Sequence, residues 1–414
     1  MANIVEMTRE ARKHLRGIAR ETPLEFNEGL SARFGAKIYL KREDLQPVRS
    51  YKVRGAYNCM RTLSPTEKKR GIVCASAGNH AQGVAFSCAK LKVRGTICMP
   101  QNTPRQKVDR VASIGGTYVA IRLVGDTFDE ASAIAQQLAK RKGMTFIHPF
   151  DDPLVIAGQG TVAAEILEQL KVSPDYVILP AGGGGLIAGS GTFIKATCPS
   201  AKIVGVEASG AAGLDASLKA GKVVTLAAID TFVDGSAVKT IGTRTFRLAQ
   251  KVVDSMIVVP EGKVCEVMID LYQRDGIVAE PAGALSIAAL DSLGEKLKGK
   301  TVVCVVSGGN NDISRYPEIV ERALVYRGLK HYFIINFSQR PGALRRLLDE
   351  ALGPTDDITL FEYTKKNNRE SGPALIGVEL AKREDLKPLL KRMDAIGISY
   401  ELLPPDSSIF RFLI

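Results

Sequence analysis

Short apolar runs alternate with helical stretches along most of the chain. The runs are rich in Val and Ile and apolar on both faces, and they predict strands at residues 37–42, 71–76, 96–100, 117–122, 145–149, 175–181, 202–208, 255–260 and 301–309. Strands of this kind are typical of parallel sheets that helices cover on both sides. Helical patterns fill the connections, as at residues 126–141 and 153–170. The alternation predicts an α/β fold with mostly parallel sheets.

The pattern changes after residue 329. The tail is predicted to form elements in the order β-α-β-β-α-β, with strands at HYFIINF, DITLFEYTKK, ALIGVELA and a closing SIFRFLI. This order is ferredoxin-like. We therefore predict a boundary at 325–331, between a larger domain at 1–325 and a small domain at 330–414.

The composition is that of an ordinary soluble globular protein, with 45% hydrophobic and 24% charged residues in 414. The apolar runs are shorter than the roughly 18 residues that cross a bilayer. Glu6 and Glu10 stand among the first arginines, which is unlike a targeting segment. The seven cysteines and four histidines lack the spacing of a disulfide frame or a metal site. We expect a cytoplasmic protein with no membrane partner and no metal ligands.

The net charge of +12 is concentrated in the front part of the chain. Residues 1–110 carry 22 Lys and Arg against 9 Asp and Glu. Aromatic residues make up only 6% and Trp is absent, so a stacking platform for nucleic acid bases is not expected. We expect most of these charges to form a solvated positive surface and a minority of them to attract a small anionic ligand.

A glycine run follows one of the predicted strands. Gly182, Gly183, Gly184 and Gly185, with Leu186, stand between DYVILPA and a helical stretch. Glycine amides at a helix N-terminus can approach a phosphate closely. The same run also fits the dinucleotide fingerprint G-x-G-x-x-A, with Glu207 near the place of a ribose-binding acid. A nicotinamide dehydrogenase is therefore an open alternative at this point.

Two further loops follow predicted strands. The first is Ser76-Ala77-Gly78-Asn79-His80, whose small residues expose amides at a helix start and suit a carboxylate. Asn79 could instead cap that helix. The second is Ser307-Gly308-Gly309-Asn310, which could aim a hydroxyl at a ligand.

Lys52 is the candidate nucleophile. Pro47 separates a strand from a helix predicted to begin near Ser50, which puts Lys52 in the first helical turn. The positive helix end and the neighbours Arg49 and Arg54 would lower the pKa of its amine and make it nucleophilic. A lysine, a phosphate loop, a carboxylate loop and a strand-end serine are the parts that a pyridoxal phosphate enzyme requires, whereas hydride transfer needs no such lysine.

Four segments now carry a family resemblance: KREDLQPVRSYKVRGAY, ASAGNHAQGVA, AGGGGLIAG and VSGGN. In this order they resemble the serine/threonine dehydratases, which are pyridoxal phosphate enzymes of fold type II. The resemblance covers 1–325 and implies a tryptophan synthase β-like fold of two parallel-sheet subdomains, the smaller at roughly 53–150. The segment FSQRPGALRRLLDEALGPTDDITLFEY resembles the single ACT-like regulatory domain of biosynthetic threonine dehydratases.

The resemblance also implies a role for each matching residue. Lys52 would carry the cofactor and remove the substrate α-proton. The cofactor would be bound by Lys52, Tyr51, Asn79, Gly182, Gly183, Gly184, Gly185, Leu186 and Ser307. The substrate carboxylate would be bound by Ser76, Ala77, Gly78, Asn79 and His80.

The implied reaction converts L-threonine into 2-oxobutanoate and ammonia, and L-serine into pyruvate, as the first step of isoleucine biosynthesis. Isoleucine would be the effector, with valine as a second candidate, in a homotetramer. A catabolic serine/threonine dehydratase is the alternative within the family.

Two positions narrow the implied chemistry. Serine racemases are similar to this chain but have a second serine where it has Ala77, so racemisation is not expected. Relatives that bind a divalent cation near the Glu207 strand have an acid where this chain has Gly213. A divalent site is therefore not expected, and a monovalent ion stays open.

Overall fold

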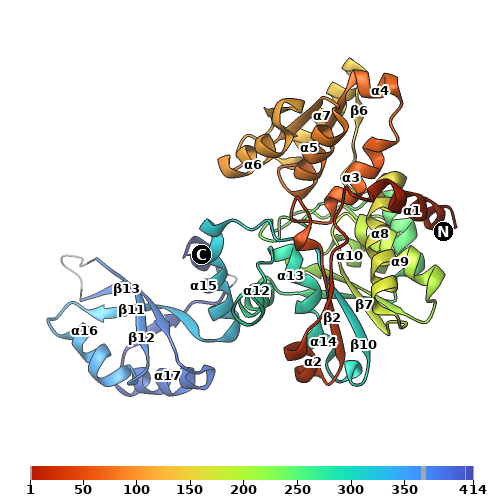
Figure 1. Ribbon diagram of the computed structural model, residues 1–414. Coiled ribbons are helices and arrows are strands. Elements are labelled where there is room, and N and C mark those ends of the chain that lie inside the picture. The colour runs from red at the N-terminus through yellow and green to blue at the C-terminus, as the bar shows by residue number, and fades with distance from the viewer. Residues whose placement is uncertain (1, 365–369, 406, 414) are drawn as a thin grey trace. The chain divides into compact units, whose positions relative to one another are not determined.

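The structure is a computed structural model that describes residues 2–364, 370–405 and 407–413 (Figure 1). The chain divides into two compact units, residues 1–311 and 312–414. The boundary predicted at 325–331 includes the last residues of helix α15 (Tyr316–Arg327), which belongs to the second unit.

The larger sheet of the first unit has six strands in the order β1-β2-β10-β7-β8-β9. All neighbours are parallel except β1, which pairs antiparallel with β2 at the edge. The three-residue strand β1 was not predicted. The bounds are β1 (Leu24–Phe26), β2 (Lys37–Arg42), β7 (Tyr176–Pro180), β8 (Lys202–Ala208), β9 (Ser255–Val259) and β10 (Thr301–Val306).

Helices cover both faces of this sheet because successive strand residues point to opposite sides. Alternate residues such as Val177, Ile203 and Val303 are buried in one core with residues of α8 and α9. Helix α13 contacts β10, β7 and β8 as well. The helices of this part are α1 (Ala2–Leu15), α2 (Glu28–Phe34), α8 (Pro153–Leu170), α9 (Gly185–Thr197), α10 (Gly213–Ala220), α11 (Thr243–Val252), α12 (Glu261–Asp275), α13 (Pro281–Ala288) and α14 (Leu290–Leu293).

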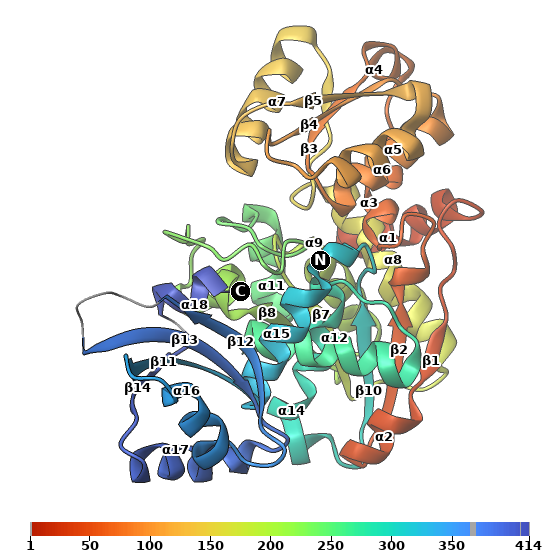
Figure 2. The ribbon, with the colours of Figure 1, turned by 90° about the vertical axis from the view of Figure 1, so that its left-hand side faces the viewer.

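The smaller sheet has four parallel strands in the order β5-β4-β3-β6. Helices α5 and α6 lie on one face and α7 on the other (Figure 2). Ile72 and Ile97 accordingly pack in the core of α5, whereas Val73 and Cys98 pack against α7. The bounds are β3 (Ile72–Ala75), β4 (Gly95–Met99), β5 (Val119–Leu123), β6 (Thr145–Phe146), α3 (Lys52–Arg61), α4 (Pro65–Arg70), α5 (Asn79–Leu91), α6 (Arg105–Gly115) and α7 (Phe128–Lys142).

The second unit contains an antiparallel sheet in the order β12-β13-β11-β14, the ferredoxin-like arrangement. Its core joins the sheet to helix α17 and to the π-helical segment Leu347–Ala351 that follows α16. The bounds are β11 (Lys330–Ser338), α16 (Ala343–Arg346), β12 (Asp357–Tyr363), β13 (Ser371–Glu379), α17 (Leu386–Ala395), β14 (Ser399–Leu402) and α18 (Ser408–Leu413).

The closing strand was predicted at the wrong place. Residues 399–402 form β14 and pair with β11, whereas SIFRFLI contains helix α18. Pro404 and Pro405 follow β14 and have no amide hydrogen to continue a ladder, so the strand ends before them. Residues 365 and 366 of the predicted strand DITLFEYTKK, and residue 414 of SIFRFLI, lie outside the described residues.

Within the part of the chain that the structure describes, every helix is too short or too polar to cross a membrane.

Candidate active site

One cavity of about 290 Å³ lies at the carboxyl ends of the parallel strands in the first unit. This is the edge at which α/β sheets bind ligands. Loops that follow β3, β6, β7 and β10 line it together with the start of α3. The lining includes every residue predicted for the site, namely Tyr51, Lys52, Ser76, Ala77, Gly78, Asn79, His80, Gly182, Gly183, Gly184, Gly185, Leu186 and Ser307.

Lys52 is the first residue of α3, two residues after the predicted helix start. Its Nζ donates a hydrogen bond to the carbonyl oxygen of Pro149 at 3.1 Å. Burial lowers the pKa of Lys52 to about 8, and the charge of Glu280 opposes the shift. The predicted lowering of the pKa is confirmed, but the predicted contribution of Arg49 and Arg54 is not among its causes. Burial is the main contribution, and the Arg54 guanidinium is held by two carboxylates.

The glycine run leaves no room for side chains. A Cβ on Gly183 would lie 2.2 Å from the Phe150 ring, and one on Gly182 would lie 2.4 Å from the carbonyl oxygen of Ser236. Gly184 has φ +90°, which favours glycine, and stands at the N-cap of α9. The backbone amides at this helix start therefore form a cradle that suits a phosphate.

The loop after β3 carries the second predicted anion site. Gly78, not Asn79, is the N-cap of α5, so the capping role considered for Asn79 was wrong. The Asn79 amide instead donates to Glu280 Oε1 at 2.6 Å and accepts from Asn310 Nδ2 at 2.7 Å. Its side chain is thereby fixed at the cavity wall.

His80 is neutral in this loop. Burial, with a smaller contribution from Lys52, lowers its pKa to about 3. Nε2 lies 3.0 Å from the carbonyl oxygen of Ile147 and donates to it, so the proton is on Nε2. Nδ1 then carries a lone pair and has no hydrogen-bond partner among the described residues.

Sequence reasoning missed Glu280. This buried carboxylate precedes Pro281 at the start of α13 and accepts hydrogen bonds from Asn79 and from the amide of Asn310 at 3.2 Å. Burial raises its pKa to about 7, and Asp234 adds to the shift. The signal was available, because Glu280 is the one acid in the apolar segment IVAEPAGALSIAAL.

The segment IHPFDD after β6 was also missed as part of the site. His148 Nδ1 accepts hydrogen bonds from the amides of Phe150 at 3.2 Å and Asp151 at 2.8 Å, which fixes a tight turn. This turn presents the Pro149 carbonyl to Lys52 and the Phe150 ring to the glycine run. Asp151 then accepts from the amide of Thr245 at 2.9 Å and so ties the turn to α11.

Ser307 follows β10 and is buried. Its hydroxyl donates to the carbonyl oxygen of Ala282 at 3.2 Å, and its own carbonyl accepts from the amide of Tyr51 at 3.2 Å. Ser307 therefore links the end of β10 to the residue that precedes Lys52.

Glu207 does not serve as an open ribose ligand. Its two oxygens accept hydrogen bonds from the amides of Leu214 at 2.9 Å and Asp215 at 2.8 Å, at the start of α10. Burial raises its pKa to about 7. Its engagement with the backbone weakens the dinucleotide interpretation of the glycine run. Among the residues that the structure describes, the acidic, histidine and cysteine side chains form no cluster of three that could hold a metal.

Comparison with known proteins agrees with this geometry. The family model "Pyridoxal-phosphate dependent enzyme" matches residues 15–308, and "C-terminal regulatory domain of Threonine dehydratase" matches residues 321–413. The biosynthetic L-threonine dehydratase of Bacillus subtilis (strain 168) is 54% identical over 405 residues, which is 98% of this chain and 96% of that protein.

This chain is also similar to solved structures of a threonine deaminase and a serine racemase. The processed form of threonine deaminase isoform 2 from Solanum lycopersicum has a TM-score of 0.73 at 42% identity, over 77% of this chain and 93% of that chain. Maize serine racemase has a TM-score of 0.71 at 30% identity, over 78% of this chain and 98% of that chain.

Proposed function

Because the chain belongs to the family of biosynthetic L-threonine dehydratases, which are pyridoxal phosphate-dependent lyases, we propose that it converts L-threonine into 2-oxobutanoate and ammonia. L-Serine would give pyruvate by the same chemistry. The observation that carries the proposal is the position of Lys52, a lysine with a lowered pKa, in one cavity with the glycine cradle.

The cradle fits the cofactor phosphate because side chains on Gly182 and Gly183 would collide with Ser236 and Phe150. Gly182, Gly183, Gly184, Gly185 and Leu186 would hold the phosphate through their amides, and Lys52 and Asn79 would hold the ring end. When bound, pyridoxal phosphate stores the electron pair that the substrate α-carbon releases with its proton. Lys52 receives that proton at Nζ, because a pKa of about 8 leaves a useful fraction of the amine uncharged near neutral pH.

The loop Ser76–His80 would bind the substrate carboxylate. Its amides stand at the start of α5, which favours an anion, and His80 is neutral beside them. Tyr51 and Ser307 would flank the cofactor ring, with the hydroxyl of Ser307 turned from Ala282 toward the ring nitrogen. A hydroxyl does not hold a proton on that nitrogen as a carboxylate would, which favours prompt elimination.

Ala77 bears on the stereochemical outcome. It lines the cavity where serine racemases have a serine, and its methyl group has no proton to donate. The enzyme should therefore eliminate water from L-serine without making D-serine. Chiral chromatography after long incubation with L-serine tests this, and D-serine in amounts comparable to pyruvate would contradict it.

The main experiment is spectroscopic. Purified protein should show a visible band of lysine-bound cofactor that borohydride removes, and peptide mapping after reduction should find the label on Lys52. Lys52→Ala should lose the band and the turnover while keeping its far-ultraviolet circular dichroism. Label on another lysine, or no cofactor after reconstitution, would overturn the assignment.

The second unit supports regulation by an amino acid. It matches the regulatory domain of threonine dehydratases, which favours the biosynthetic over the catabolic role. We infer isoleucine as the effector, with valine as a second candidate, and a homotetramer in the cytoplasm. Near the turn Gln339–Leu344, Gln339 Nε2 is buried without a hydrogen-bond acceptor among the described residues, so it can donate to a ligand.

Calorimetry with the full-length protein tests the effector. Linkage requires that isoleucine and threonine weaken each other's binding equally, typically by 1–3 kcal/mol. Absence of isoleucine binding at millimolar concentration would defeat this part and leave the catalytic assignment standing.

A further inference from the structure

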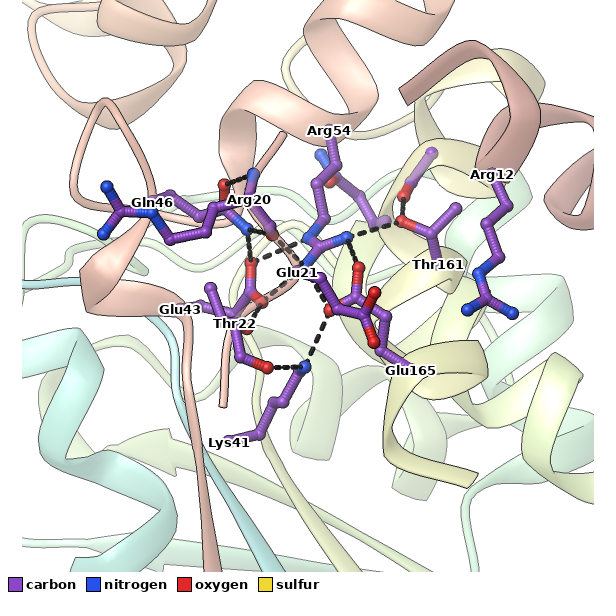
Figure 3. A network of polar contacts seen from close by, with 12 residues as sticks. Arg12, Arg20, Glu21, Thr22, Lys41, Glu43, Gln46, Arg54, Thr161 and Glu165 are labelled. Atoms are coloured by element: carbon purple, nitrogen blue, oxygen red, sulfur yellow. Dashed lines mark hydrogen bonds and ion pairs between the residues drawn. The ribbon is translucent and has the colours of Figure 1, made fainter. Parts of the chain in front are cut away.

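Three ion pairs are buried immediately behind the lysine-bearing turn. Arg54 lies between Glu43 and Glu165, and Lys41 reaches Glu165 from the other side (Figure 3). We name these four residues the Arg54 cluster. Each is buried, and Lys41 and Glu43 are fully inaccessible to solvent.

The Arg54 cluster contains two basic and two acidic side chains, and each of the four takes part in hydrogen bonds. The five N–H groups of Arg54 reach both oxygens of Glu43, both oxygens of Glu165, the hydroxyl of Thr161 and the carbonyl of Arg20. Lys41 Nζ donates to the carbonyl of Thr22 at 2.6 Å, to Glu165 at 2.7 Å and to the side-chain oxygen of Gln169 at 3.2 Å. Figure 3 shows these contacts converging from strand β2, helix α3 and helix α8.

The Arg54 cluster closes the loop that carries Lys52. The chain leaves the cluster at Glu43, turns through residues 46–51, and returns at Arg54, whose guanidinium forms a two-pronged contact with Glu43 at 2.8 Å on each side. Lys52 lies inside this closed loop, two residues before Arg54. Any displacement of the Arg54 side chain therefore has to be absorbed by the first turn of α3.

The same turn is enclosed on its other sides by close backbone packing. A Cβ on Gly83 of α5 would lie 3.1 Å from the carbonyl carbon of Lys52, and a Cβ on Gly158 of α8 would lie 2.6 Å from the Cα of Gly55. Helix α8 thus contacts α3 through Gly158 and through Glu165 seven residues later. The tyrosine before Lys52 is tied to the end of β10 through Ser307.

Such a cluster is not explained by stability alone. Burying two charges costs solvation free energy, and the attraction between the charges often does no more than offset this cost. Apolar residues of similar volume therefore stabilise a core at least as well. A planar, two-sided guanidinium contact is in contrast strict about geometry.

We propose that the Arg54 cluster is a positioning device for Lys52: it fixes the first turn of α3 so that the Lys52 amine stays desolvated and directed into the cavity. Arg54 acts through the backbone and is a positioning residue, not a catalytic one. The catalytic meaning of this inference rests on the function proposed above, whereas the effect on the Lys52 amine does not.

Arg54→Lys tests the proposal, because an ammonium keeps the charge but cannot bridge two carboxylates in a plane. The full-length chain, freed of cofactor, is pulsed with acetic anhydride across pH 6–11, and acetylation of Lys52 is measured by peptide mass spectrometry. The wild-type midpoint is expected near 8. In Arg54→Lys it should rise by about one pH unit toward the ordinary lysine value as the turn loosens and water enters.

The loaded enzyme supplies a second measurement. A misplaced amine should lower kcat for threonine by about tenfold or more while KM changes much less. The matched control is Lys263→Met, which removes the ion pairs of a buried lysine of α12 with Glu266 and Asp291 in the same unit. It should lower the unfolding midpoint yet leave the Lys52 midpoint and kcat at wild-type values.

A folded Arg54→Lys with reduced stability but an unchanged Lys52 midpoint would overturn the proposal and leave only a structural cluster. If Arg54→Lys does not fold, Glu43→Gln replaces it, with the same expected rise and the same overturning result. If wild-type protein neither binds cofactor nor turns over threonine, the proposed function fails, and the acetylation comparison still decides the positioning role.

Discussion

Lys52 and Arg54 are two cations, two residues apart on α3, in opposite environments: Arg54 is buried, whereas Lys52 lines the cavity and is partly buried. Burial alone would lower the pKa of Arg54, but Glu43 and Glu165 more than compensate and raise it. Lys52 has one carbonyl as its hydrogen-bond acceptor in the described residues, and burial lowers its pKa to about 8. The comparison shows that two carboxylate partners outweigh burial at Arg54, whereas burial prevails at Lys52 and also at Lys41, whose pKa it lowers despite the carboxylates of Glu43 and Glu165.

Two buried carboxylates, Glu43 and Glu280, also differ in the direction of their pKa shifts. Glu43 is buried with Arg54 and Lys41, and these cations outweigh burial and lower its pKa. Glu280 is also buried but has amide donors and a nearby acid, and burial raises its pKa to about 7. One side of α3 therefore carries the paired charges of the Arg54 cluster, and we call it the closed side. The other side, which we call the open side, contains groups that titrate near neutral pH.

The largest expected effect comes from opening the closed side. Arg54→Leu would leave Glu43 and Glu165 buried with Lys41 as their one remaining cation in the cluster. We expect the free energy of unfolding to fall by about 3–5 kcal/mol, measured by urea denaturation.

An exposed ion pair of the same unit is the control for that variant. Arg33 lies 2.6 Å from Asp291, and their side chains are 48% and 37% exposed. Arg33→Leu should cost less than about 1 kcal/mol. Equal losses in the two variants would show that burial of the Arg54 cluster carries no special weight.

The second expected effect is a gain in stability, and it comes from replacing Lys52 on the open side. Lys52→Met should abolish turnover but stabilise the cofactor-free protein at pH 7 by about 3 kcal/mol, because the wild type must keep an ammonium in a desolvated place. The folded pKa near 8 lies below the ordinary 10.5, so the unfolded state binds more protons between these values. Wild-type stability should therefore rise between pH 8 and 10.5.

Urea midpoints of the two cofactor-free proteins at pH 7 and pH 10 check this prediction. The advantage of Lys52→Met should shrink as the pH rises. An advantage that is the same at both pH values would mean that the Lys52 amine is not perturbed in the folded protein.

The third effect concerns Glu280. Its folded pKa of about 7 lies above the ordinary 4.5, so the unfolded state loses its proton first and stability falls as the pH rises from 4.5 to 7. Glu280→Gln should remove that part of the decline, a gain of about 2 kcal/mol at pH 7 after allowing roughly 1 kcal/mol for one lost acceptor. Glu207 titrates in the same window and is unchanged in both proteins, so the comparison isolates Glu280. Parallel stability curves for the two proteins from pH 4.5 to 7 would refute the assignment.

Features that depend on residues close together in the sequence could be predicted, whereas features that depend on residues far apart in the chain could not. Local patterns sufficed for helix α8, which has the predicted bounds 153–170, and for loops such as Gly182–Leu186 that follow strands. The Arg54 cluster was not legible, because Glu165 is 111 residues from Arg54 and only the packing of α8 on α3 joins them. The sequence correctly indicated a lowered pKa for Lys52 and its place at a helix start, but it did not reveal burial as the main cause. The charge of Arg54 is directed at Glu43 and Glu165.

The smallest predicted effect is a change in the pKa of Glu280 when the nearby charge of Lys107 is removed. Lys107 of α6 lies 2.6 Å from Asp234, and both line the cavity with Glu280. Asp234 raises the pKa of Glu280, whereas Lys107 lowers it. In Lys107→Met the acid would act without its cation, so the pKa of Glu280 should rise above about 7, by less than one unit because these charges are partly exposed to solvent. Infrared titration of the protonated carboxyl stretch measures this, and Glu280→Gln identifies the band. If the midpoint is unchanged in Lys107→Met, the cavity mouth is screened by water, and burial alone accounts for the raised pKa.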